Sequence, residues 1–517
     1  MSKSVTNNMM AKMALNILNV VLPLITGPYL AHTLDVDLYG QYNQAFALIS
    51  WFIPFASLGI YNYGLRVISQ AKKDPVRLET LFTSLFTMGV ISTCLVTGVY
   101  VLYALFVPSS ALVPLYLLLS IQLIASAFLV EWMNEAFENY GFILYKTLII
   151  RVLYVISIFI FVRHAEDILP YTFIASLVLL VNNLCSFAYV KRKVRFRRIG
   201  KHDLTGLIKP LLIMLLLTNA NMFYTTLDRL FLSVFAKDIP AYTSFYTFSL
   251  TITQLITNVI NAIVLATIPR LATYLGENRQ KDYLGLLHSS SRTFFMLGIP
   301  MSIGISVMAY PIMYIYGNEA YLPAGLTLAI FGVRCLLWLC DIVLANQVIF
   351  VHGKESLLTK IYFVGGGVNL LLNSLLVVFH QVRPEWMILT TIVSEIVLVL
   401  LQWRCVRLNF GKTIRVFDWN TLKYLLTALC FYPIVYLINR ICGLEFRYNM
   451  RFFAIVMISV VVCAAFYGLV LLVTKDEALL YLLRAVKNKL LRLFSQVFRC
   501  IGRLFQRFIR LFRRRKR

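Results

Sequence analysis

The chain has 517 residues, of which 60% are hydrophobic and 14% are charged, and its formal net charge is +26. A soluble domain contains roughly a quarter charged residues, so this composition excludes an ordinary soluble globular protein. The apolar residues form long runs, which indicates an all-α polytopic membrane protein. The nine cysteines are scattered, and no Cys-x-x-Cys is present, so we expect neither a disulfide framework nor a metal site.

Segments that could span a bilayer recur along the whole chain. A spanning helix needs about 20 mostly apolar residues, and this criterion predicts fourteen transmembrane helices. They are expected at 11–32, 41–65, 79–106, 112–133, 146–162, 169–190, 210–235, 242–268, 291–316, 323–350, 358–379, 386–403, 421–439 and 452–473.

Lysine and arginine are distributed unevenly between the loops. Loops after even-numbered segments, such as 66–78 and 191–209, are basic, whereas 33–40 and most other loops after odd-numbered segments contain few basic residues or none. Basic residues are retained on the cytoplasmic side, so both termini are expected in the cytoplasm. The apolar stretch after Lys12 is too long for a cleaved signal peptide and lacks a small-residue cleavage site.

The longest polar stretch between helices divides the chain into two six-helix lobes. A two-helix hairpin and a basic tail follow the second lobe. The expected boundaries are 1–190 for the first lobe, 191–209 for a cytoplasmic inter-lobe loop, 210–406 for the second lobe, 407–474 for the hairpin and 475–517 for the tail.

The two lobes resemble each other weakly in sequence. Gly40-Gln41-Tyr42 can be placed on Pro240-Ala241-Tyr242, and each second helix of a lobe then ends at an arginine, Arg66 or Arg270. Both lobes begin with an odd-numbered helix, so the repeats would run parallel, which is one plan known among transporters.

The first predicted helix contains the stretch NILNVVLPLITGPYLA at 16–31. Its amides, Pro23 and Thr26 share one helical face. Unsatisfied polar groups are costly in hydrocarbon, so this face meets either a neighbouring helix or a water-filled cavity. The second, seventh and eighth predicted helices also have polar faces, which favours a cavity between the lobes. The amides expected to line it are Asn16, Asn19, Asn219, Asn221, Gln254, Asn258 and Asn261.

Several charged residues fall inside the predicted helices. A charge at the bilayer centre costs at least about 2.5–3.5 kcal/mol, so such residues are functional candidates. Arg334 and Asp341 are two turns apart, and each is expected to have a partner on another helix. The cations outnumber the acids, which favours an anionic cargo such as a phosphate. The cationic candidates are Lys12, Arg66, Arg151, Arg270 and Arg334.

The stretch KNKLLRLFSQVFRCIGRLFQRFIRLFRRRKR at 487–517 alternates apolar residues with arginines at helical spacing. Amphipathic basic helices lie in the membrane interface and are attracted to anionic lipid. We expect the tail to anchor there, with docking of a partner enzyme as the alternative. No nucleic-acid-binding fold is indicated.

Five stretches, in this order, resemble Wzx-type polysaccharide flippases of the MOP exporter superfamily, which includes MATE transporters. They are NILNVVLPLITGPYLAHTLDVDLYGQYNQAFALISWF (16–52), GIYNYGLRVISQ (59–70), EWMNEAFENYGFILYK (131–146), TTLDRLFLSVFAKDIPAYTSFYTFS (225–249) and GVNLLLNSLLV (367–377).

This resemblance implies a V-shaped fold around a central cavity and no cofactor. It implies transfer of undecaprenyl-pyrophosphate-linked oligosaccharide across the bacterial inner membrane. Lys12, Arg66, Arg270 and Arg334 could attract the pyrophosphate. It also implies coupling to H⁺ or Na⁺, for which Asp228, Asp341 and Glu395 are candidates. A glycan polymerase and glycosyltransferases are possible partners.

Three other functions compete with this interpretation. A MATE-like drug exporter would carry cations and favour buried acids, which the cationic balance of this chain argues against. A lipid II flippase would have an anionic lipid cargo as well, so this alternative is not excluded by the charges. A membrane enzyme would need a large outer loop or a cytosolic catalytic domain. No His-Glu-x-x-His, Walker loop or Gly-x-Ser-x-Gly is present, so we expect the chain not to be an enzyme.

Overall fold

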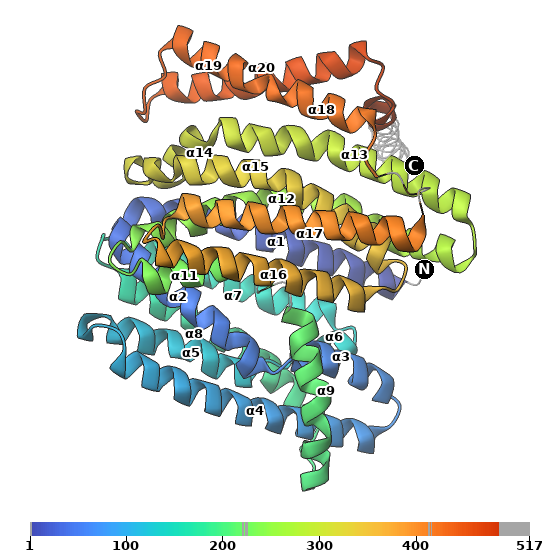
Figure 1. Ribbon diagram of the computed structural model, residues 1–517. Helices are drawn as coiled ribbons and strands as arrows, with labels where there is room; N and C mark the ends of the chain where they lie inside the picture. Colours follow the sequence, from blue (N-terminus) through green and yellow to red (C-terminus); the bar gives the residue numbers. More distant parts are fainter. Residues whose placement is uncertain (1–2, 220–221, 223–225, 412–413, 415, 485–517) are drawn as a thin grey trace, which may run out of the picture. The chain divides into compact units, whose positions relative to one another are not determined.

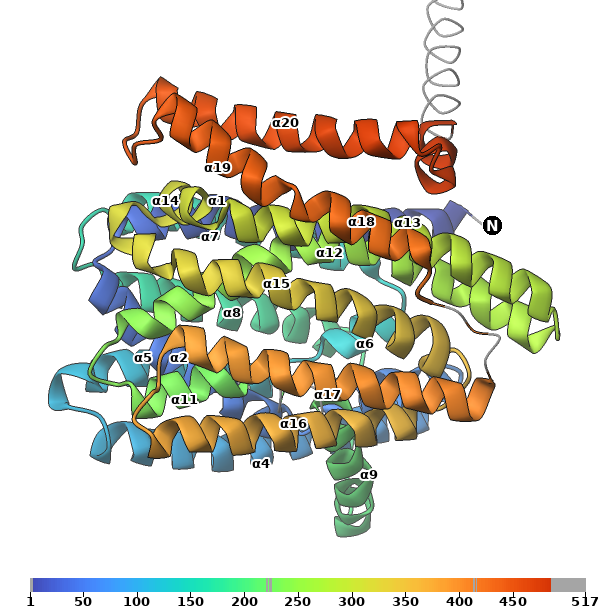
Figure 2. The same ribbon diagram turned by 45° about the horizontal axis from the view of Figure 1, so that its top comes forward.

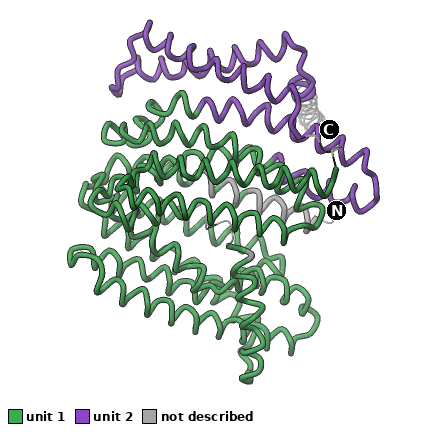
Figure 3. Tube along the Cα trace, in the orientation of Figure 1, with its two compact units in different colours: residues 1–262, 305–412 green, residues 263–304, 413–517 purple. Residues whose placement is uncertain are grey.

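The computed structural model describes residues 3–219, 222, 226–411, 414 and 416–484 (Figure 1). In these ranges the regular structure is entirely helical. The described chain forms two compact units, residues 1–262 with 305–412 and residues 263–304 with 413–517 (Figure 3). The division into lobes 1–190 and 210–406 remains a prediction.

The first unit holds most of the helices. Its first half contains α1 (Lys3–Thr33), α2 (Val36–Ser57), α3 (Ile60–Ala71), α4 (Pro75–Phe106), η1 (Ser110–Leu112), α5 (Val113–Ala127), α6 (Glu131–Ala136), α7 (Tyr140–Phe161), α8 (Ile168–Lys191) and α9 (Lys201–Asn219). Its second half contains α11 (Leu227–Phe235), most of α12 (Ala241–Gly276), α14 (Ala309–Gly317), η2 (Glu319–Ala324), α15 (Gly325–Ile342), the π-helical η3 (Val343–Phe350), α16 (Glu355–Val378) and α17 (Pro384–Phe410).

The second unit contains the end of α12 and most of α13 (Gln280–Val307), with α18 (Trp419–Leu429), α19 (Phe431–Cys442) and α20 (Met450–Val473). Asp476, just after α20, accepts hydrogen bonds from Lys423 Nζ at 2.6 Å, Tyr424 OH at 2.9 Å and Arg292 Nη2 at 3.1 Å. This carboxylate therefore joins α13, α18 and the segment after α20.

Eleven described helices or helix pairs are long and apolar enough to cross a membrane, or up to twelve if the bent pair α13 and α14 is one span. The expected fourteen spans are therefore not all found. The predicted span at 11–32 lies within α1, which is not among the eleven. The predicted span at 210–235 is divided between α9 and α11. The basic inter-lobe loop, expected at 191–209, extends only to Gly200.

The α9 helix runs across the direction of α4 and α16 in both views (Figures 1 and 2). It packs where α2 and α3 are separated by Leu58 and Gly59, both at positive φ. A Cβ at Gly59 would lie 2.7 Å from the Leu215 backbone nitrogen. Glycine at 59 therefore permits both the turn and the close approach of α9.

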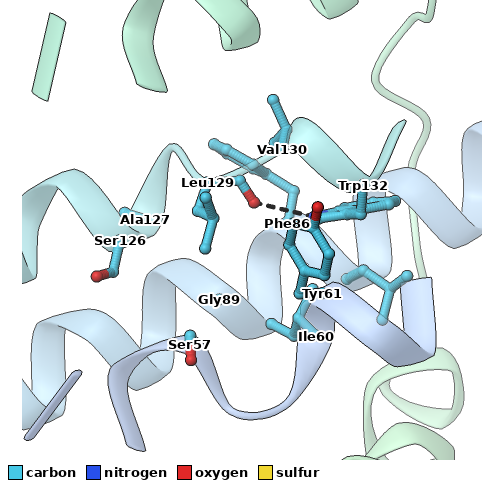
Figure 4. Close-up of a pocket in the computed structure, with 11 residues that line it drawn as sticks. Ser57, Ile60, Tyr61, Phe86, Gly89, Ser126, Ala127, Leu129, Val130 and Trp132 are labelled. Atoms are coloured by element: carbon cyan, nitrogen blue, oxygen red, sulfur yellow. Dashed lines mark hydrogen bonds between the residues drawn. The ribbon is translucent and has the colours of Figure 1, made fainter. Parts of the chain in front are cut away.

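A second break, between α5 and α6, faces the one between α2 and α3 (Figure 4). A cavity of about 20 Å³ lies between them and includes Ser57, Ile60, Val130 and Trp132 in its lining. The Trp132 indole N–H donates to the Leu129 carbonyl at 2.9 Å. The cavity is large enough for one water molecule but not for a substrate.

The two halves of the first unit meet at the start of α2 and α12. Asn43 Nδ2 donates to Ser244 Oγ at 2.8 Å, and both side chains are buried. A Cβ at Gly40 would lie 2.3 Å from the Pro240 carbonyl carbon. The residues paired by the internal-repeat alignment, Gly40 and Pro240, are therefore in direct contact. The polar side chains of Asn43 and Ser244 therefore connect the two halves near the N-terminal ends of α2 and α12.

Candidate functional site

A cavity of about 630 Å³ lies among the helices of the first half of the first unit. This volume is within the usual range for sites that hold a drug-sized ligand. Side chains of α1, α2, α3 and α5 to α8 line it. Its polar lining consists of Gln122, Glu131, Glu135, Thr147, Arg151, Asn182, Asn183, Tyr42, Tyr61, Tyr140, Tyr154 and Tyr171. The mixture of one arginine, amides, aromatic rings and two glutamates, of which Glu131 is paired with Lys146, offers hydrogen bonds and aromatic faces to a polar ligand and one cation to an anionic group.

Arg151 is on α7 and is the one arginine in this lining. No ion pair to Arg151 occurs within the described part of the chain. The neighbouring cation on the same helix, Lys146, is instead paired, with its Nζ 2.9 Å from Glu131 Oε2. Arg151 is therefore the cation available to a ligand in this cavity, and Glu135, which also forms no described ion pair, is an anionic group in the same lining.

The Lys146 pair is almost completely buried and hydrogen-bonded on several sides. Lys146 Nζ also donates to Ser186 Oγ at 2.6 Å and to the Asn182 carbonyl at 3.4 Å, and the Ser186 hydroxyl donates to Glu131. Buried ion pairs need such additional bonds to offset the loss of hydration. Sequence analysis missed Lys146, although a lysine at the start of an apolar helix is a usable signal.

Asp228 lies on α11 and is 1% exposed. Its Oδ2 accepts hydrogen bonds from Tyr246 OH at 2.6 Å and Thr391 Oγ1 at 2.5 Å, and its Oδ1 accepts from Asn373 Nδ2 at 2.7 Å. Asn373 is bonded in turn to Asn369 Oδ1 at 3.1 Å. These donors are all neutral. The neighbouring Arg229 acts on this carboxylate electrostatically but donates no described hydrogen bond to it. A buried carboxylate that no cation contacts directly is unfavourable unless it binds a proton or a cation.

Asp341 and Glu395, the other two predicted coupling residues, differ in their partners. Asp341 Oδ1 accepts from Gln402 Nε2 at 2.6 Å and from Tyr362 OH at 3.3 Å, again from neutral groups. Glu395 Oε1 accepts from Arg334 Nε at 2.9 Å. Partners on other helices, as expected for Arg334 and Asp341, are confirmed. Of these three acids, Glu395 accepts a hydrogen bond from a cationic side chain, whereas the described donors to Asp228 and Asp341 are neutral.

The remaining cationic candidates do not line the 630 Å³ cavity. Arg66 is exposed on α3, with its guanidinium 5.4 Å from the centre of the Tyr63 ring. Arg270 is exposed on α12 and donates from Nε to Tyr274 OH at 2.9 Å. Arg334 is engaged with Glu395. Of the five predicted head-group residues, the structure brings Arg151 to a cavity, whereas the side chain of Lys12 lies outside the described residues.

The amides predicted to line a cavity between the lobes are dispersed. Asn219, at the end of α9, donates to the Leu215 carbonyl at 2.9 Å. Gln254 and Asn258 are exposed on α12, and Asn261 on the same helix is partly buried. None of these four lines the 630 Å³ cavity. Asn221 and the side chains of Asn16 and Asn19 lie outside the described residues, as does the tail from 485 onward.

Comparison with known proteins places the chain among membrane transporters. Residues 5–275 match the family described as "Polysaccharide biosynthesis protein". A "Putative O-antigen transporter" of Shigella dysenteriae is 23% identical over 75% of this chain and 96% of its own length. One from Escherichia coli (strain K12) is 23% identical over 68% of this chain and 85% of its own length.

Two solved structures show the fold. "Lipid II flippase MurJ, inward closed conformation" matches with a TM-score of 0.69 at 14% identity, covering 90% of this chain and 99% of that one. An inward-facing MATE transporter of the MOP superfamily matches with a TM-score of 0.56 at 13% identity, covering 76% and 99%. The fold is thus an all-helical polytopic membrane fold like those of MurJ and MATE proteins.

The resemblance noted from the five sequence stretches is confirmed at the level of the family. The match, with the relatives and the fold, also confirms that the chain belongs with transporters and not with enzymes. Because the family match covers more than half of the 517 residues, the chain is a member of the polysaccharide biosynthesis protein family.

Proposed function

We propose that this protein is a flippase that moves an undecaprenyl-pyrophosphate-linked oligosaccharide across the bacterial inner membrane by alternating access. The repeat unit would belong to O-antigen, capsule or exopolysaccharide. The observation that carries the proposal is the 630 Å³ cavity with Arg151 in its wall. The relatives described as O-antigen transporters support the same cargo class.

The cavity's chemistry suits the head group and not the lipid tail. Arginine binds phosphate oxygens through a planar fork of N–H donors. Gln122, Asn182 and Asn183 provide amides of the kind that bond sugar hydroxyls, and the tyrosines provide aromatic faces. The volume accommodates a pyrophosphate with a few sugars, so the polyprenyl chain would remain in the bilayer.

The contact between α2 and α12 fits one state of an alternating-access cycle. The basic loops predict that the end with residues 33–40 faces outward, and there the buried bond between Asn43 and Ser244 joins the two halves. This contact supports a carrier that is closed at its outer end. Substrate would therefore enter from the cytoplasmic side before this contact opens.

Coupling to H⁺ or Na⁺ would act through the buried acids of the second half. Among the described residues, the hydrogen-bond donors to Asp228 and Asp341 are all neutral. A proton or cation that neutralises them changes the cost of burial, and it could thereby bias the equilibrium between the two states.

Purified protein in proteoliposomes tests the proposal with a fluorescent undecaprenyl-pyrophosphate oligosaccharide, with and without a proton or sodium gradient. We expect transfer above that of empty liposomes and at least a tenfold loss in Arg151→Ala, with partial recovery in Arg151→Lys. The matched control is Arg163→Ala, at an exposed position just beyond the same helix.

Equal transport by Arg151→Ala and the unaltered protein would refute the role of the cavity. Pumping of dye cations in place of glycolipid would favour the MATE-like alternative. Transfer of lipid II at the same rate as of the oligosaccharide would favour the lipid II alternative.

A further inference from the structure

A second cavity, of about 280 Å³, lies outside the proposed substrate path. It is formed where the turn after α3, the start of α4, the α6–α7 connection and the end of α8 come together. The basic loops place this end of the helices on the cytoplasmic side. The volume of this cavity is slightly below the usual range of about 300–1,000 Å³ for ligand sites, so the cavity suits a single head group and not an oligosaccharide.

One part of the lining of this cavity is apolar and the other part is polar. The apolar part consists of Pro75, Leu78, Met133, Phe137, Val190 and Val194. The polar part contains Lys72, Lys193, Glu79, Asn134 and Asn139. A phosphate group would find two ammonium groups here, and the apolar surface would hold the glycerol and the first methylene groups of a lipid.

Asn134 provides an independent reason to expect a ligand. The residue is 1% exposed, and its Nδ2 has no hydrogen-bond partner among the described residues. A buried N–H group without a partner is costly, and such groups are uncommon unless water, an ion or a ligand satisfies them. Asn134 lines the cavity, although its Nδ2 is itself buried, so a half-turn of the amide group would present the N–H donor to an acceptor oxygen bound there and relieve the cost.

The charged side chains in the cavity lining restrict which lipid head group could bind there. Lys72 is partly neutralised by Glu138, with 3.7 Å between Nζ and Oε1. Lys193 donates to the hydroxyl of Tyr189 and carries no ion pair in the described structure. Glu79 likewise forms no described ion pair. A head group with a phosphate near the lysines and an ammonium near Glu79 would match both signs.

We propose that this cavity binds the phosphate of a membrane phospholipid, preferentially a zwitterionic phosphoethanolamine head group, at the cytoplasmic face. Lys72, Lys193 and Asn134 would hold the phosphate, and Glu79 would face the ammonium. Basic pockets between membrane helices on the cytoplasmic side are known to recognise phospholipid head groups. The site is separate from the 630 Å³ cavity and does not depend on the proposed flippase activity.

Titration of the full-length protein in detergent, followed by native mass spectrometry and calorimetry, tests the site. The probes are dioctanoyl phosphatidylethanolamine, dioctanoyl phosphatidylglycerol and inorganic phosphate. We expect one saturable site that binds the phosphatidylethanolamine at least fivefold more tightly than the phosphatidylglycerol. Inorganic phosphate that competed at equal concentration would identify a site for a free phosphate, which would overturn the lipid assignment.

Four substitutions and one control locate the binding. Asn134→Asp keeps the shape and replaces the N–H donor, so we expect at least a tenfold loss. Lys193→Gln at the exposed rim should cost about fivefold without affecting folding. Glu79→Gln should remove the preference for phosphatidylethanolamine. Lys73→Gln is the control for Lys72→Gln, because Lys73 carries the same charge one position along and does not line the cavity.

Equal losses for Lys72→Gln and Lys73→Gln would show diffuse attraction to a basic surface and overturn the proposal. Unchanged lipid binding in Lys193→Gln would also overturn the proposal. This variant tests the site even if Asn134→Asp fails to fold. Binding without saturation would also refute it.

Discussion

Gly40 and Pro240, which are 200 positions apart, touch in the structure, and an added Cβ at Gly40 would lie 2.3 Å from the Pro240 carbonyl carbon. The same two positions correspond when the internal repeats are aligned. Equivalent elements of the two repeats therefore meet each other directly at the predicted outer end. The two backbones are so close at this contact that one added methyl group at residue 40 would disturb it.

Gly40→Ala should weaken the closed contact between α2 and α12. Overpacking costs typically ~1–3 kcal/mol, and a shift of that size changes a two-state equilibrium by about 5- to 150-fold. The measurement is labelling of Thr243→Cys, a fully buried position beside the contact, by a membrane-impermeant maleimide in a cysteine-free chain. We expect faster labelling with alanine at 40. Gly98→Ala is the control, because a Cβ there meets no atom within 4 Å, and equal labelling in both would contradict the prediction.

Asp228→Asn should remove the dependence of transport on an ion gradient, because the substitution keeps the size of the side chain but cannot bind a cation in the same way. We expect at least a tenfold loss of gradient-driven transfer in proteoliposomes. Asp238→Asn, at an exposed position just after α11, should leave it unchanged. Transport by Asp228→Asn that still follows the gradient would move the coupling role to Asp341.

Arg334→Met should destabilise the protein more than replacement of both members of its ion pair. The Arg334 and Glu395 side chains are 12% and 3% exposed. Removing one partner leaves a buried charge and costs about 3–5 kcal/mol, whereas replacing both with apolar residues is often close to neutral. Thermal unfolding in detergent should therefore rank Arg334→Met below Arg334→Met with Glu395→Leu. The opposite order would show that the pair itself stabilises the second half.

Asp476 should make the second unit sensitive to acid. Burial alone would raise the pKa of this carboxyl, but hydrogen bonds from Lys423, Tyr424 and Arg292 outweigh it and lower the pKa to about 2. An unfolded aspartate has a pKa of about 3.9, so its contribution is present above about pH 4 and is lost as the pH falls towards 2.

Asp476→Asn should lower stability at pH 7 by about 1.5–3 kcal/mol, the usual value of hydrogen bonds to a charged group. The difference in melting temperature from the unaltered protein should shrink as the pH falls below 4. Glu477→Gln is the matched control, because Glu477 pairs with the same Arg292 but its side chain is 85% exposed, and surface pairs contribute about 0–1 kcal/mol. A constant difference at all pH values would contradict the assignment.

Long apolar runs predicted most of the spans well, because length and composition alone decide whether a helix can cross a bilayer. The transverse α9 was not predicted, since its orientation depends on packing against Gly59 and not on its own composition. The candidate site was predicted only in part. Arg151 was identified because a charge in an apolar helix stands out. That Arg151 forms no described ion pair depends on Glu131 being paired with Lys146 instead, and one sequence does not reveal this contact between helices.

The chain that leads from α8 towards α11 is fixed to the first half of the first unit at two places. The Arg197 backbone N–H donates to Thr83 Oγ1 at 3.0 Å, and α9 rests on Gly59. The described part of this connection, residues 192–219, is therefore held against the first half and is not a slack tether. Any movement of α9 must either carry the end of α2 with it or separate the helix from Gly59, so this part transmits motion as a stiff lever.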